Sequence, residues 1–180
     1  VTYGAAISAC EKGRRPERAL ELLEEMAARR VWPGVICYSA AVSACEKVGR
    51  AELAVRLLGC MRRDGLQPNV VTYSAAISAC EKAGDAEKAM ALLEEVGRAR
   101  LRPNVVTYNA AMLACCAGRQ VARALDLLDV MVDRRVAPDA QACGRLLMEC
   151  EQGGRPARER RLLRSLVAAA GPGGARALRS

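Results

Sequence analysis

The chain has 180 residues, of which 52% are hydrophobic and 27% charged, and its formal net charge at pH 7 is +8. No apolar run approaches the roughly 18–20 residues that a membrane-spanning helix needs, so no transmembrane segment is predicted. Histidine is absent, which excludes Ser-His and Cys-His nucleophile pairs and histidine general bases.

The sequence repeats itself at a step of 35 residues. ISACEK at 7–12 returns at 77–82, with VSACEK between them at 42–47. A fixed period of this length predicts a repeat architecture. Three aligned columns carry the register: Tyr3, Tyr38, Tyr73 and Tyr108; Cys10, Cys45, Cys80, Cys115 and Cys150; and Pro33, Pro68, Pro103 and Pro138.

These columns divide the chain into four repeats, a degenerate or capping unit and a tail. The first unit begins inside a repeat, so we expect it to be truncated and the chain to be part of a longer array. The predicted units are 1–34, 35–69, 70–104, 105–139 and 140–170, followed by a flexible tail at 171–180.

Each unit is predicted to contain two helices, of which the first carries the tyrosine column. In the third unit Tyr73, Ile77 and Cys80 follow i, i+4, i+7 spacing, which predicts a helix from about Thr72 to Ala83. Gly84 is expected to end it, as Gly49 does one repeat earlier.

The second helix of each unit has its own apolar stripe. Ala89, Leu92, Leu93 and Val96 follow i, i+3, i+4, i+7 spacing. In the first unit Pro16 stands where this helix should begin, a position that tolerates the missing N–H of proline.

Helices of this length are marginal alone in water and need neighbours. The predicted fold class is therefore all-α, an α-solenoid superhelix of about five stacked antiparallel helix-turn-helix repeats. We expect ten helices, with the rings of Tyr38, Tyr73 and Tyr108 packed inside. The outer wall is expected to carry solvated acidic residues, namely Glu24, Glu25, Glu94, Glu95, Asp126 and Asp129.

The nine cysteines do not indicate a metal site or disulfides. Five fall in one column, and no CxxC pair is present. We interpret them as reduced, buried, small apolar side chains, with no metal and no cofactor.

The motif content separates this chain from tetratricopeptide repeats, whose Trp-x-x-Leu-Gly-x-x-Tyr opening is missing. Units such as VVTYSAAISACEKAGDAEKAMALLEEV...LRPN and VVTYNAAMLACCAGRQVARALDLLDVMVDRRVAPD closely resemble pentatricopeptide repeats of the 35-residue P type. The resemblance covers about residues 1–169.

The resemblance implies a single-stranded RNA-binding module of mitochondria or chloroplasts that reads about one base per repeat and carries no chemistry of its own. Such proteins act in organellar RNA processing, stability, editing or translation. The resemblance implies an organellar address, whose targeting segment is not present in this chain.

In the family, bases are read by the residue after the first-helix tyrosine together with the residue after the closing proline. The matching base-reading pairs here are Ser39 with Asn69, Ser74 with Asn104, and Asn109 with Asp139. The aliphatic residue two places before the tyrosine packs on base faces, and these base-packing residues are Val1, Ile36, Val71 and Val106. The resemblance associates Ser plus Asn with adenine and Asn plus Asp with uracil, which gives A, A, U in the 5′ to 3′ direction.

Two departures limit this transfer. The first unit carries Gly4 and Gly34 at the pair positions and cannot read a base in the usual way. The last unit has Cys143 in the tyrosine column and Gln141 in the base-packing column.

The same polar residues have another interpretation, in which they are not RNA-binding. Ser39, Ser74 and Asn109 can serve as helix-start residues that satisfy free N–H groups, and Asn69 and Asn104 as turn residues.

Three functions follow from these interpretations. The first is sequence-selective binding of single-stranded RNA, and the second is a scaffold that holds protein partners. An RNA-processing enzyme is the third, and it requires a catalytic domain that these repeats do not supply. Protein partners are also expected on the convex face, and no membrane partner is expected.

Residues 151–180 contain seven arginines and two glutamates, which fits either a phosphate-binding patch or a solvated cap.

Overall fold

The computed structural model describes residues 2–153 and 156–169 and contains ten α-helices over these residues. Base-packing residue Val1 and the predicted tail at 171–180 lie outside them. The helices are α1 (Tyr3–Lys12), α2 (Pro16–Ala28), α3 (Val35–Val48), α4 (Ala51–Arg63), α5 (Val70–Ala83), α6 (Ala86–Arg98), α7 (Val105–Ala117), α8 (Val121–Asp133), α9 (Ala140–Gln152) and α10 (Pro156–Ala169).

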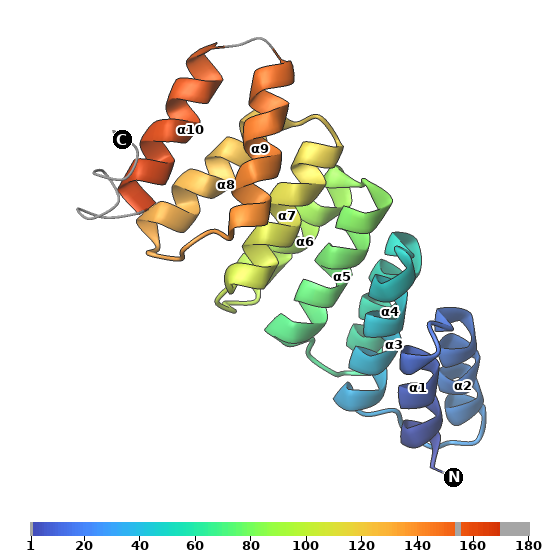
Figure 1. The fold of residues 1–180 in the computed structure, drawn as a ribbon. Coiled ribbons are helices and arrows are strands. Elements are labelled where there is room, and N and C mark those ends of the chain that lie inside the picture. Colours follow the sequence, from blue (N-terminus) through green and yellow to red (C-terminus); the bar gives the residue numbers. More distant parts are fainter. Residues whose placement is uncertain (1, 154–155, 170–180) are drawn as a thin grey trace.

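The helices form five antiparallel pairs stacked along one direction, which confirms the predicted all-α solenoid (Figure 1). Each first helix contacts its own second helix and the first helix of the next pair, so α1, α3, α5, α7 and α9 form one continuous row. Each second helix from α2 to α8 also contacts the first helix that follows it. The hydrophobic core therefore extends through successive pairs instead of lying at one centre.

Aligned apolar columns fill the spaces between helices. Ile7, Val42, Ile77 and Met112 are fully buried at equivalent positions of α1, α3, α5 and α7. Small residues such as Ala76 and Ala79 are also fully buried, and they let neighbouring first helices approach closely. The second helices contribute a column of fully buried alanines, which are Ala19, Ala54, Ala89 and Ala124.

The tyrosine rings pack inside, as predicted. Tyr38, Tyr73 and Tyr108 are 3–4% exposed. The hydroxyl of Tyr38 donates a hydrogen bond to Asp64 Oδ2 at 2.6 Å, and burial together with this carboxylate raises the pKa of Tyr38. Arg62 donates to the hydroxyl of Tyr73 and pairs with Glu95 of the next second helix. The rings of Tyr38 and Tyr73 thus tie their helices to neighbouring chain segments.

Helix boundaries agree with the sequence in some places and differ in others. α2 begins at Pro16, and Gly49 and Gly84 end α3 and α5 in the left-handed conformation, as predicted. The predicted start of α5 near Thr72 is two residues late, since the helix begins at Val70. The reason is that Asn69 caps this helix, so its first turn precedes the apolar pattern.

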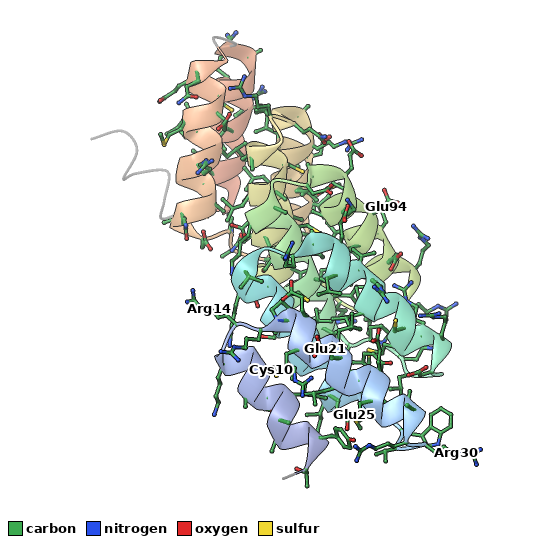
Figure 2. All side chains as sticks on the ribbon, turned by 90° about the vertical axis from the view of Figure 1, so that its right-hand side faces the viewer. Cys10, Arg14, Glu21, Glu25, Arg30 and Glu94 are labelled. Atoms are coloured by element: carbon green, nitrogen blue, oxygen red, sulfur yellow. The ribbon has the colours of Figure 1, made fainter. Side chains whose placement is uncertain are left out.

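The acidic residues of the outer wall form ion pairs that join successive repeats. Glu24 pairs with Arg56 one repeat on, and Asp126 and Asp129 both pair with Arg161. Figure 2 shows Glu94 on the outside of the molecule, where it pairs with Arg98 of its own helix. Partly exposed pairs of this kind contribute little each, so packing carries most of the stability.

The divergent fifth unit still forms a helical pair. α10 packs against α8 and α9, and the hydroxyl of Ser165 donates to Asp129 Oδ1 at 2.5 Å. Leu146 and Leu162 are fully buried. Arg161, one of the seven arginines at this end, is therefore engaged with the fourth repeat.

No helix among the described residues is long and apolar enough to cross a membrane. The same part of the chain holds no group of three or more His, Cys, Asp or Glu side chains that could bind a metal ion.

The buried cysteines should resist alkylation in the folded protein. Burial raises the pKa of Cys45 to about 12 and the pKa values of Cys80 and Cys115 to about 11. Because the thiolate is the reactive form, these thiols should label with N-ethylmaleimide far more slowly at pH 8 than the half-buried Cys37 and Cys60, and faster as pH rises. Peptide mass spectrometry after timed labelling measures this. Equal labelling rates for Cys80 and Cys60 would contradict the packing described here.

Candidate nucleic-acid interface

The three polar base-reading pairs lie along one face of the row of first helices. Ser39, Ser74 and Asn109 each lie one turn inside a first helix, while Asn69, Asn104 and Asp139 are the N-caps of α5, α7 and α9. The structure brings the two members of every pair together, although they are 30 residues apart in sequence.

In the second repeat a threonine joins the pair. The hydroxyls of Ser39 and Thr72 lie 2.8 Å apart. Thr72 Oγ1 also donates to Asn69 Oδ1 at 3.0 Å, and the same oxygen accepts the backbone N–H of Thr72 at 2.9 Å. The carbonyl of Asn69 is thereby fixed, and its Nδ2 donates no hydrogen bond within the described chain.

The third repeat has the same arrangement with two more hydrogen-bond contacts. Ser74 and Thr107 hydroxyls lie 2.7 Å apart, and Thr107 Oγ1 donates to Asn104 Oδ1 at 2.9 Å. The N–H of Asn104 returns a bond to Thr107 Oγ1 at 3.2 Å, which completes a capping box. Ser74 Oγ also lies 2.8 Å from the carbonyl oxygen of Val70, which competes with Thr107 Oγ1 for its one hydroxyl proton.

The fourth repeat has no bridging threonine, because Ala142 occupies that column. The longer Asn109 side chain reaches Asp139 directly, with Nδ2 donating to Asp139 Oδ2 at 2.8 Å. Asn109 is 6% exposed, and its Oδ1 is buried without a hydrogen-bond partner in the described part of the chain. An unsatisfied buried acceptor costs about 1–3 kcal/mol, so stability alone does not explain this residue.

These contacts correct the helix-start interpretation of the pair residues. Ser39, Ser74 and Asn109 do not cap helices, because they lie within the helices. Ser39 and Ser74 bond to the next repeat, and Asn109 bonds to Asp139. Asn69 and Asn104 are helix caps and not turn residues. The prediction missed Thr72 and Thr107, which are buried and connect the pairs. Their only sequence signal is the recurrent Thr-Tyr dipeptide.

The described base-packing residues are unusually exposed for aliphatic side chains. Ile36, Val71 and Val106 are 80%, 64% and 54% exposed. A shallow hollow of about 200 Å³ is lined by Val71 and Val106 together with Ser39 and Ser74. Aliphatic and polar pair residues therefore share one surface of the row of first helices, which we call the concave face. In the fifth unit Gln141 takes the aliphatic position and is exposed.

The first repeat offers no pair side chains. Gly4 lies in the first turn of α1, and Gly34 occupies the N-cap of α3 without a side-chain bond. A Cβ added at either glycine would meet nothing within 4 Å. The structure thus leaves open space where the next repeats carry polar groups.

Charges on the concave face are largely paired. Lys47 bonds to Glu11 at 3.1 Å and Lys82 to Glu46 at 3.3 Å. Burial, and to a lesser degree the nearby Glu46 carboxylate, raises the pKa of Glu81, against the lowering effect of Lys82. The face is consequently polar but close to charge balance.

Three sequence profiles of one family match nearly the whole array. The pentatricopeptide repeat domain matches residues 56–119, the PPR repeat family matches 103–148, and the PPR repeat matches 1–31 and 36–66. The chain belongs to the pentatricopeptide repeat family. No curated protein matches it.

Solved structures of pentatricopeptide repeat proteins share its fold. The PPR domain of Arabidopsis thaliana protein-only RNase P 1, in complex with tRNA, superposes with a TM-score of 0.77 at 18% identity, covering 90% of this chain and 86% of that one. Nuclear proteinaceous RNase P 2 from A. thaliana gives 0.78 at 16% identity, covering 91% and 37%. PPR10 from maize gives 0.69 at 28% identity, covering 93% of this chain and 24% of that one. PPR10 has also been solved with an 18-nucleotide psaJ RNA element.

The bridging threonine should stabilise the array. Replacing Thr107 with valine keeps the shape but removes the hydroxyl that bonds Ser74 and Asn104. We expect a loss of about 1–2 kcal/mol in the free energy of unfolding, the size of a helix cap or of one to two net hydrogen bonds. Urea unfolding followed by circular dichroism measures it.

The matched control is Thr2→Val, at the same column of the first repeat, where the residue is exposed and makes no side-chain cap bond. The control should change stability little. Equal effects of the two replacements would show that the bridge contributes nothing.

Proposed function

We propose that this pentatricopeptide array binds single-stranded RNA on its concave face and selects bases through the three polar pairs, one base per repeat. The observation that carries this proposal is the geometry of the pairs. In the second, third and fourth repeats, two polar side chains 30 residues apart in sequence come together beside exposed aliphatic residues. Aliphatic side chains beside a base face give binding that does not depend on base identity, and polar pairs supply the selection. The RNA-bound relatives support the choice of partner.

The hydrogen-bond directions at the second repeat suit adenine. Asn69 Oδ1 is occupied by Thr72, so the free Nδ2 faces a ligand as a donor. When Thr72 donates to Asn69, Ser39 donates to Thr72 and keeps its lone pairs as acceptors. Adenine offers an acceptor nitrogen and an exocyclic amino donor on its Watson–Crick edge, which complements this arrangement.

The fourth repeat offers the opposite hydrogen-bonding groups to a base. Asp139 is an acceptor at both carboxylate oxygens, and uracil carries an N–H donor between two carbonyls on its pairing edge. The array would then read A, A, U in the 5′ to 3′ direction.

The proposed function has no catalytic step by this chain. The array acts as a binding module in organellar RNA processing, stability, editing or translation, within a longer repeat protein. Even at the roughly 1–3 kcal/mol per base that aromatic stacking contributes, three bases would offset association costs of at least about 4 kcal/mol only narrowly, and the packing residues here are aliphatic. Binding by these repeats alone should therefore be weak.

Exchanging one pair should change base preference. Copying the fourth pair into the second repeat requires three changes, Ser39→Asn, Asn69→Asp and Thr72→Ala. The third change is needed because Thr72 lies between the members of the second pair, whereas the equivalent residue at the fourth pair is the smaller Ala142. We expect the preference of the second repeat to change from adenine to uracil by about 1–2 kcal/mol, or roughly 5–30-fold in affinity.

The measurement compares wild type and triple variant on strands with AAU and UAU cores, at one fixed salt concentration because phosphate contacts depend on salt. A strand with an AAA core is the internal control, since the untouched fourth repeat should disfavour it in both proteins. Folded proteins that bind all strands equally would refute base selection and favour the protein scaffold.

A further inference from the structure

Several unpaired cations of the repeats lie in the loops between them. We define the basic rim as the four six-residue loops that join a second helix to the next first helix, at 29–34, 64–69, 99–104 and 134–139. These loops contain six arginines and two aspartates. Arg30, Arg100, Arg102, Arg134 and Arg135 are exposed and make no ion pair with described residues.

Three of these arginines adopt a conformation that ordinarily favours glycine. Arg30, Arg100 and Arg135 have φ values of 56°, 54° and 56°. The equivalent position of the remaining loop is Gly65, with φ 76°. Non-glycine residues rarely adopt left-handed backbone angles because Cβ then crowds the backbone. The fold accepts glycine there, so it does not itself require these arginines.

The rim adjoins the base-reading pairs. Each loop ends on its N-cap residue, so Arg100 and Arg102 precede Asn104 by four and two residues. Four residues of chain span at most about 14 Å. Lys47 and Lys82 beside the second and third pairs are engaged with glutamates, whereas the rim arginines Arg100 and Arg102 make no ion pair with described residues.

We propose that the basic rim binds phosphate groups of the RNA whose bases lie on the concave face. This inference rests on the proposed function and extends it. Arginine binds phosphate with a planar, bidentate guanidinium, and an exposed unpaired side chain has no carboxylate partner to give up when it does so. The rim then supplies the affinity that three weakly held bases lack, without affecting base choice.

The opposite edge of the array provides a matched control. In the turns inside the repeats Arg14 and Arg119 also have left-handed φ values, of 54° and 56°, and Gly49 and Gly84 occupy the equivalent positions. Figure 2 shows Arg14 and Arg30 at opposite ends of the first helical pair, both directed away from the ribbon. A 13-residue helix separates the two edges by about 20 Å, more than the screening length of about 8 Å at physiological salt.

The experiment compares two double variants of the full chain, Arg100→Gly with Arg135→Gly on the rim, and Arg14→Gly with Arg119→Gly on the opposite edge. Both remove the same charge and install the glycine that the chain itself uses at those columns. Affinity for a single-stranded RNA longer than its AAU core is measured from about 50 to 200 mM salt. Circular dichroism confirms folding.

The rim variant should bind more weakly, and its slope of log affinity against log salt should flatten by about 1.4, which is about 0.7 for each of two lost phosphate contacts. The opposite-edge variant should keep the wild-type slope. Trp32 is the sole tryptophan of the chain, lies on the rim and is 81% exposed, so RNA should change its fluorescence in wild type.

Equal slopes for wild type and rim variant, or equal flattening in both variants, would overturn the rim proposal. The preference for AAU over UAU strands, measured in the same titrations, separates this result from failure of the proposed function. If wild type binds with base preference but the rim variant keeps the wild-type affinity and salt slope, only the rim proposal is contradicted. Wild type that binds no RNA contradicts both.

Discussion

Close packing between successive first helices is the constraint on which the rest of the structure depends. Fully buried alanines such as Ala76 and Ala79 keep side-chain bulk out of these interfaces. Residues 33 positions apart then approach within hydrogen-bond distance, as Ser39 and Thr72 do at 2.8 Å. A larger residue at the buried alanines would separate the helices and break these bonds. The polar surface thus depends on an apolar interface directly beneath it.

In the proposed function, the cap residues couple stability to base recognition. Asn69 and Asn104 satisfy the first N–H groups of α5 and α7 with their carbonyl oxygens, which leaves their amide nitrogens for a ligand. One side chain therefore holds a helix start and presents a donor in a fixed direction. Pre-organised groups lose little conformational freedom on binding, so short polar residues can discriminate where flexible ones could not.

Sequence periodicity predicts most of the fold because each buried column recurs without insertion or deletion. The rings of Tyr38, Tyr73 and Tyr108 are buried as that pattern predicts. The start of α5 was misplaced because a cap lies outside the apolar pattern. The bridges through Thr72 and Thr107 escaped prediction because they depend on the register between two repeats. Left-handed arginines such as Arg100 are likewise invisible to patterns that expect glycine there.

The measurement that tests base selection most directly is photo-crosslinking with a strand whose AAU core carries 4-thiouridine at the uracil. One base per repeat requires that uracil lie beside Val106, Asn109 and Asp139. Peptide mapping should therefore find adducts in the first turns of α7 and in the loop before α9. Adducts concentrated on the outer helix α8, or spread evenly over the four repeats, would contradict the account.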